Sequence, residues 1–190
     1  MMSTLNSTAI HPQDACDKLS TIRFSDTGSD IPLPIQTDAA RQYSYLSTHD
    51  FVWINTTVTG EANPYDYMIL EACMAGQYRY GDAEDILDHA APMFERLLLQ
   101  KPFEEGNRRT ALISLLTFLN FNGYATAVSD VEAARLTLAV ENEEMTAAQA
   151  VAAIAAPAKD GGITGISLRQ LVAHECNHHM DALKILMDTE

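Results

Sequence analysis

The chain has 190 residues, of which 47% are hydrophobic, and a formal net charge of −14. This length and apolar content predict one folded domain with a sizeable core and exclude a disordered chain. The acidic balance argues against non-specific nucleic-acid binding and against an anionic membrane surface, because both need basic side chains. The three cysteines, Cys16, Cys73 and Cys176, lie far apart, so a disulfide framework is not expected.

The N-terminal part of the chain differs in composition from the rest. Residues 1–40 are rich in Ser, Thr and Asp and contain three prolines, which predicts a polar arm that is extended or partly disordered. Residues 41–190 are predicted to form one helical domain. The sequence has neither an apolar run long enough to span a bilayer nor a secretory signal peptide, so we expect a soluble cytoplasmic protein.

The first predicted helices follow from apolar spacing and capping residues. The spacing over 43–54 predicts a helix. Pro64 is placed as the first residue of the next helix. Asp82 is expected to cap a third helix that runs through Leu98.

The central prediction is a helix that begins near Gly106–Asn107 and ends near Asn122–Gly123. Its apolar side chains cover nearly the whole circumference, which is typical of a helix buried in the centre of a domain. Further helices are expected from Ser129–Asp130 through Val140, from Thr146 to a stop at Pro157, and over 167–187, with a turn at 160–165. The predicted fold class is therefore all-α.

The segment Lys101-Pro-Phe-Glu-Glu-Gly-Asn-Arg-Arg-Thr-Ala111 runs into this central helix and has the composition of a phosphate-binding loop. The first amides of a helix carry partial positive charge and bind anions. Gly106 allows a phosphate to approach the backbone, Arg109 offers a planar fork and Arg108 adds charge.

Acidic and amide side chains complete the predicted loop chemistry. Glu104 and Glu105 can hold Mg²⁺, which takes few carboxylates together with phosphate oxygens. Asn107 can hydrogen-bond a transferring group, and Phe103 can anchor the loop in the core. The alternative is an ordinary helix start, where acidic residues are stabilising in any case. Residue spacing alone leaves the two interpretations open.

The same segment resembles the signature of the Fic/Doc (Fido) superfamily, in particular its Doc branch, which reads His-x-Phe-x-Asp/Glu-Gly-Asn-Lys-Arg-Thr-Ala. The likeness extends over roughly 43–155 and includes Leu70-Glu71-Ala72 and the run from Thr117 to Tyr124. It implies a helical bundle around one buried helix, with the signature loop at the N-terminus of that helix. It also implies Mg²⁺- and ATP-dependent transfer of a phosphoryl or AMP group to a Ser, Thr or Tyr hydroxyl of a protein. Doc is a toxin held off by a small antitoxin, so an antitoxin is a further expected partner.

By position in the motif, the resemblance assigns a role to each loop residue. Glu105 matches the metal carboxylate, and Gly106 and Asn107 match the anion cradle. Arg109 matches the phosphate-binding arginine, and Arg108 matches the Doc lysine. Leu112 stands where Fic enzymes have a second arginine, which Doc-type sequences also lack.

Lys101 departs from the pattern, because the family has its catalytic histidine at this position. That histidine accepts the proton of the target hydroxyl, a role suited to a pKa of about 6.5. An ordinary lysine, with a pKa of about 10.4, is protonated at neutral pH and cannot do so. Two hypotheses follow: a transferase in which Lys101 takes part with Asn107 and Arg109, or an inactive pseudoenzyme that binds nucleotide or protein.

Three other segments carry candidate chemistry. His174-Glu175-x-x-His178 fits a zinc metallopeptidase pattern, but a third ligand is missing and a polar helix face is the favoured interpretation. Thr137–Asn142 resembles the Fic inhibitory motif; since the arginine that its glutamate would pair with is absent, we expect Glu141 to lie at an exposed helix end. Residues 78–80, Tyr-Arg-Tyr, either form a target-docking flap or cover the core edge.

Overall fold

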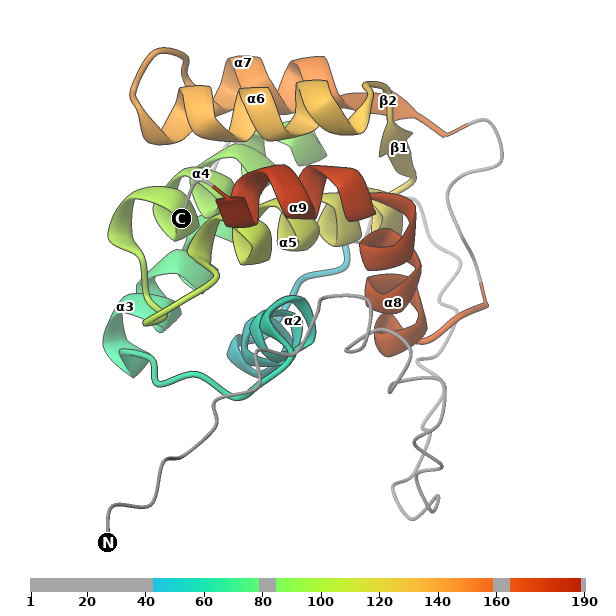
Figure 1. Ribbon diagram of the computed structural model, residues 1–190. Coiled ribbons are helices and arrows are strands. Elements are labelled where there is room, and N and C mark those ends of the chain that lie inside the picture. The colour runs from blue at the N-terminus through green and yellow to red at the C-terminus, as the bar shows by residue number, and fades with distance from the viewer. Residues whose placement is uncertain (1–42, 79–84, 159–164, 189–190) are drawn as a thin grey trace, which may run out of the picture.

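The computed structural model describes residues 43–78, 85–158 and 165–188 (Figure 1). These ranges hold eight α-helices, one short 3₁₀ helix and one antiparallel pair of strands. The predictions for the arm 1–40, for Asp82, for Arg79–Tyr80 and for most of the turn at 160–165 lie outside the described residues.

The first helices begin where an acidic or hydroxyl side chain caps them. Helix α2 (Thr48–Thr59) starts after Ser47, which forms a capping box with Asp50. The prediction that Pro64 opens the next helix is wrong. Helix α3 (Tyr67–Met74) begins after Asp66, whose carboxylate accepts hydrogen bonds from the second and third amides of the helix. The short helix η1 (Ala75–Gln77) follows, and α4 (Ile86–Gln100) is capped by Asp85.

Helix α5 (Asn107–Phe121) is buried in the centre of the described part of the fold, as the sequence predicts. Every residue from Arg109 to Leu119 is buried. Helices α2 and α4 pack against α5, and in Figure 1 α5 crosses the middle with α2 below it. The predicted end is also confirmed, since Asn122 caps the helix and Gly123 follows with a φ of 85°.

A small hairpin corrects the all-α prediction. Strand β1 (Tyr124–Thr126) pairs antiparallel with β2 (Ala155–Pro157), with Ala125 opposite Ala156. Helix α6 (Asp130–Glu141) begins at its predicted cap Ser129, and α7 (Ala147–Ile154) begins at its predicted cap Thr146. Helix α7 stops before Pro157, because pairing with β1 makes the chain extended from residue 155 onward, despite its alanine content.

The predicted C-terminal helix is two helices. Helix α8 (Leu168–His178) ends before its C-cap His179, and α9 (Met180–Asp188) begins directly after that residue. The break arises because Asp130 at the start of α6 accepts hydrogen bonds from the backbone amides of Asp181 and Ala182, at 3.2 and 3.3 Å. An acidic residue of another helix therefore caps α9, which periodicity within one segment cannot reveal.

The first described residues are fixed at the C-terminal end of α5. The backbone amide of Ser44 donates to the side-chain oxygen of Asn122 at 2.9 Å, and the Asn122 amide donates back to the Ser44 carbonyl at 3.0 Å. The fully buried Gln77 bonds both the amide and the carbonyl of Leu46, at 2.8 and 2.9 Å. Residues 43–46 are thus held by side chains and not by a regular element.

Two simple properties of the described ranges complete the fold. Cys73 and Cys176 are both buried. None of the helices in these ranges combines the length and the apolar character needed to cross a bilayer.

Candidate functional site

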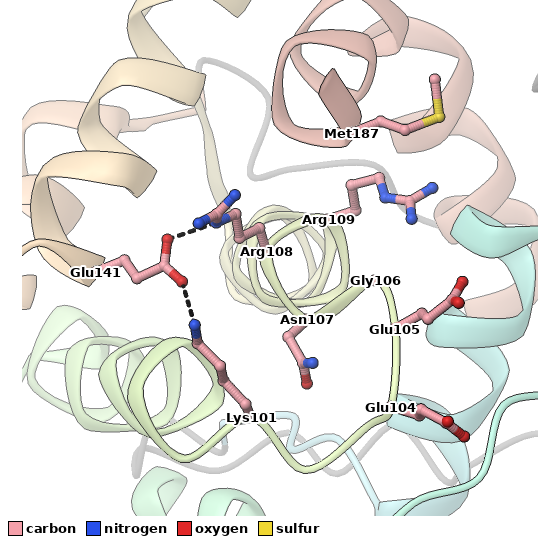
Figure 2. Close-up of a pocket in the computed structure, with 9 residues that line it drawn as sticks. All are labelled: Lys101, Glu104, Glu105, Gly106, Asn107, Arg108, Arg109, Glu141 and Met187. Atoms are coloured by element: carbon pink, nitrogen blue, oxygen red, sulfur yellow. Dashed lines mark hydrogen bonds and ion pairs between the residues drawn. The ribbon is translucent and has the colours of Figure 1, made fainter. Parts of the chain in front are cut away.

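A pocket of about 470 Å³ opens at the N-terminal end of α5 (Figure 2). Most of its lining is the predicted loop, namely Lys101, Glu104, Glu105, Gly106, Asn107, Arg108 and Arg109. Two further lining residues, Glu141 at the end of α6 and Met187 on α9, come from distant parts of the chain. The structure therefore brings the predicted site residues together around one cavity and adds two that sequence reasoning did not include.

The first half of the loop is anchored by an extended segment before α3. The amide of Asp66 donates to the carbonyl of Pro102 at 2.9 Å, and the amide of Glu104 donates to the carbonyl of Pro64 at 3.0 Å. Phe103, between them, is buried as predicted. Two backbone hydrogen bonds and one core side chain thus fix the loop on this side.

Gly106 allows the loop to press closely against α2. Its φ of +74° lies in the left-handed region that favours glycine. A Cβ built at this position would lie 2.4 Å from Cγ2 of Thr59 and 3.2 Å from Nδ2 of Asn55. Both the backbone angle and the close contact therefore require a glycine, independently of any ligand.

Asn55 on α2 is a positioning residue that sequence reasoning missed. Its side chain is buried, and its Nδ2 donates to the carbonyl of Glu105 at 2.8 Å and to Oγ1 of Thr110 at 3.0 Å. Asn63 donates to its Oδ1 at 3.2 Å. A lone asparagine among the apolar residues of a helix is the only signal the sequence offers for this role.

Two predicted ligand-binding residues also hold the protein together. Asn107 accepts the amide of Phe103 at 3.0 Å and donates to its carbonyl at 2.7 Å. Arg109 is buried, and its Nη1 donates to the carbonyl of Val58 near the end of α2 at 2.9 Å. Both residues lie at the pocket, as predicted, but part of their hydrogen-bonding capacity stabilises the loop.

Glu141 corrects a prediction, because it is not an exposed helix end. Its side chain is 8% exposed, and its two carboxylate oxygens bind Lys101 Nζ at 2.8 Å and Arg108 Nε at 2.5 Å. Burial opposes the charged form, but the hydrogen bonds and charges of these two cations outweigh burial and hold the pKa of Glu141 below its ordinary value. Glu141 is therefore ionised at neutral pH.

The pocket lining is formally neutral, with three basic and three acidic side chains. The basic groups are Lys101 on one wall and Arg108 and Arg109 in the first turn of α5. Figure 2 shows Glu104 and Glu105 on the opposite side of the helix end from Lys101 and Glu141. These two exposed carboxylates suit Mg²⁺, which binds one or two carboxylates and takes its other ligands from water and phosphate oxygens.

The His174-Glu175-x-x-His178 segment does not form a peptidase arrangement. His174 and His178 are exposed, with stacked rings 5.8 Å apart, but Glu175 is buried and accepts a hydrogen bond from Asn120 at 3.2 Å. Burial raises the pKa of Glu175 to about 7. Across the described residues, no three His, Cys, Asp or Glu side chains come together as metal ligands.

Tyr78, the described residue of the predicted flap, does not line the pocket. Its exposed ring packs on Tyr45, with ring centroids 4.9 Å apart. This contact fits the interpretation in which the tyrosine covers the core edge.

No protein-family model, curated protein or solved structure matches the chain.

Proposed function

We propose that this chain is a Doc-like protein of the Fido type that binds Mg²⁺ and ATP at the 101–109 loop and transfers a phosphoryl or AMP group to a protein hydroxyl. The observation that carries the proposal is the pocket itself, where the motif residues converge at the first turn of a buried helix. A bundle around one buried helix, with the loop at its N-terminus, is also the arrangement that the family resemblance implies.

The residues of the pocket suggest how a triphosphate would be held. Arg108 and Arg109 present guanidinium groups at the helix end, and Lys101 adds a third cation at the wall. The start of α5, with Gly106 as its N-cap, adds the partial positive charge of a helix N-terminus, which favours phosphate oxygens. Glu105, with Glu104 beside it, would hold Mg²⁺, which neutralises phosphate charge when bound. Since the lining is formally neutral, the extra positive charge of the metal is needed to balance a triphosphate.

A second candidate function is nucleotide binding without transfer. It is favoured by the ion pair between Lys101 Nζ and Glu141, because a lysine held by a carboxylate is a poor proton acceptor. A chain with this property would be a pseudoenzyme that binds nucleotide or a partner protein. The antitoxin partner and the cytoplasmic location remain predictions from the resemblance and from composition.

The test is titration calorimetry with ATP and MgCl₂, followed by a labelled-ATP transfer assay on cell-extract proteins. The unmodified chain is expected to bind ATP only when Mg²⁺ is present. Arg108→Ala should weaken binding about tenfold, or ~1.4 kcal/mol, because it removes a charge-assisted contact to phosphate.

Arg135→Ala is the matched control, since Arg135 is an exposed arginine on α6 that forms a salt bridge with Glu132 one turn away and does not line the pocket. It is expected to leave ATP binding unchanged. Absence of ATP binding by the unmodified chain would refute the proposal. Binding without transfer would favour the pseudoenzyme, and binding with label transferred to protein would favour the enzyme.

A further inference from the structure

We propose that Glu141 is the proton acceptor of this site and that Lys101, at the histidine position, holds the transferring phosphate. The inference rests on the proposed function and assigns to two side chains what one histidine would otherwise do. It follows from the position of the Glu141 carboxylate, which a helix distant in sequence brings into the pocket beside Lys101.

The contacts of Glu141 leave room for a substrate hydroxyl. One oxygen binds Lys101 and the other binds Arg108. An ionised carboxylate has about four acceptor directions, two on each oxygen. Two ion pairs therefore do not exhaust its capacity, and a hydroxyl can donate to Oε1 while Lys101 remains in contact with it.

Lys101 links this acceptor to the reacting phosphate. Its ammonium group has three donor directions, so one can bind Glu141 while another binds a phosphate oxygen. A hydroxyl on Oε1 and a phosphate on Nζ are then neighbours, because Oε1 and Nζ are 2.8 Å apart. Transfer then requires the hydroxyl oxygen and the phosphorus atom to approach to about 3 to 3.5 Å.

The ionisation of Glu141 suits a loose phosphoryl-transfer reaction. Its lowered pKa keeps the carboxylate charged and ready to accept a proton at neutral pH. A weak base is sufficient because the transition state of phosphoryl transfer is largely dissociative, and protein kinases use an aspartate in this role. Glu104 and Glu105 are less suitable, since they lie on the other side of the helix end (Figure 2).

The step is balanced as an ordinary group transfer. The hydroxyl oxygen forms a bond to phosphorus, and the bond from phosphorus to the leaving oxygen of ATP breaks with its electron pair going to the leaving group. The hydroxyl proton passes to Glu141 and from there to solvent. Lys101 only donates hydrogen bonds in this step and takes up no proton.

The decisive variant is Glu141→Gln, which keeps the size of the side chain and removes its charge. The transfer rate is expected to fall about 100-fold or more, the usual contribution of a general base, while ATP affinity stays the same or rises. The control is Glu132→Gln, an exposed glutamate on the same helix. Glu141→Asp, which retains a carboxylate but withdraws it by one methylene, should retain more transfer than Glu141→Gln.

The pH dependence gives a readout that a merely structural role would not produce. With Glu141 as base, kcat should hold from neutral pH downward and fall only below the ordinary glutamate pKa of about 4.3. In Lys101→His, the pH at which kcat falls should move toward the histidine pKa of about 6.5 if the new imidazole takes over the proton.

Several outcomes would overturn the inference. Equal or faster transfer by Glu141→Gln would show that the carboxylate restrains the loop and accepts no proton. If Glu141→Gln fails to fold, Glu141→Asp provides the test. Loss of transfer in folded Glu141→Asp, with kcat falling at the same acidic pH as in the unmodified chain, would count against the inference equally. ATP binding without any transfer by the unmodified chain would remove the base role and leave the binding proposal standing, whereas no ATP binding would remove both.

Discussion

The two ends of α6 each carry a carboxylate network, and the networks differ in their partners. At the C-terminal end, Glu141 lies between the cations Lys101 and Arg108. At the N-terminal end, Asp130 binds Nδ1 of His179 at 2.8 Å, and Nε2 of the same ring lies 3.5 Å from the Glu175 carboxylate. The helix that joins the two networks is about 18 Å long.

Burial alone does not fix the charge of a carboxyl group in this protein. Glu141 and Glu175 are both almost inaccessible, at 8% and 5% exposure of the side chain. Two cations lower the pKa of Glu141, whereas Glu175 has one neutral donor, Asn120, and its pKa rises to about 7 because of burial. For His179, burial outweighs the Asp130 contact and lowers the pKa, so this end of α6 provides no strong cation.

The largest expected effect is the pH dependence that Glu175 imposes on stability. Its pKa rises from 4.5 to about 7 on folding, so the native state binds more protons than the unfolded state between these values. Glu175 should therefore contribute a fall of about 3 kcal/mol in the free energy of unfolding as pH rises from 4.5 to 7, partly offset by His179, whose lowered pKa acts in the opposite direction. Glu175→Gln should lack this slope, which urea unfolding at a series of pH values would measure.

Glu132→Gln serves as the control for that experiment, because Glu132 is exposed and sits in a local pair with Arg135. It should retain the full slope between pH 4.5 and 7. An identical slope in Glu175→Gln would show that another group is responsible and would remove the contrast between the two ends of α6.

A second prediction compares substitutions of two glycines, Gly106 at the pocket and Gly165 away from it. Gly106→Ala combines a positive φ with a Cβ 2.4 Å from Thr59 Cγ2, whereas Gly165→Ala has a similar φ of +79° and nothing within 4 Å. Both should lose about 1 kcal/mol to backbone strain. Gly106→Ala should lose about 2 kcal/mol more from overpacking, as measured by chemical denaturation.

Thr59→Ser tests the cause of that difference, because it removes Cγ2 and keeps the hydroxyl that donates to the Asn55 carbonyl at 2.8 Å. In the Thr59→Ser background, Gly106→Ala should approach the loss seen for Gly165→Ala. A loss that stays unchanged would place the strain elsewhere in the loop.

The smallest expected effect concerns the stabilising contribution of Glu141. Its lowered pKa means that the stability it contributes is present above the unfolded pKa of about 4.3 and is lost as pH falls through the folded value. Glu141→Gln should therefore lower stability at pH 7 by about 1 kcal/mol and have less effect in acid. A loss of the same size at pH 3 would mean that packing, and not charge, is responsible.

Most of the helical framework could be predicted because its signals are local. The starts of α6 and α7 follow from Ser129 and Thr146, and α5 follows from its apolar residues and its Asn122–Gly123 end. The hairpin of β1 and β2 could not be predicted, since its short strands gain their structure from each other across about 30 residues. The break at His179 likewise depends on Asp130 of another helix.

The candidate site likewise contains residues that the sequence predicts and residues that only the packing of the helices reveals. Its loop residues are contiguous, so their gathering around one pocket could be expected from the motif. The sequence predicts an exposed Glu141, because the arginine that would pair with it in the Fic inhibitory motif is replaced by Leu112. Its actual partners are Lys101 and Arg108, and only the packing of α6 beside the loop reveals them. Asn55 on α2 and Met187 on α9 likewise reach the site from helices outside the motif, so the motif does not reveal them.

The reciprocal hydrogen bonds between Ser44 and Asn122 determine where the chain enters the fold. They lie at the C-terminal end of α5, whereas the pocket lies at its N-terminal end, about 22 Å away along the helix axis. A fluorophore or surface linker placed at Ser44 would therefore leave the pocket accessible. Surface immobilisation through this point would allow ligand and partner binding to be measured on oriented molecules.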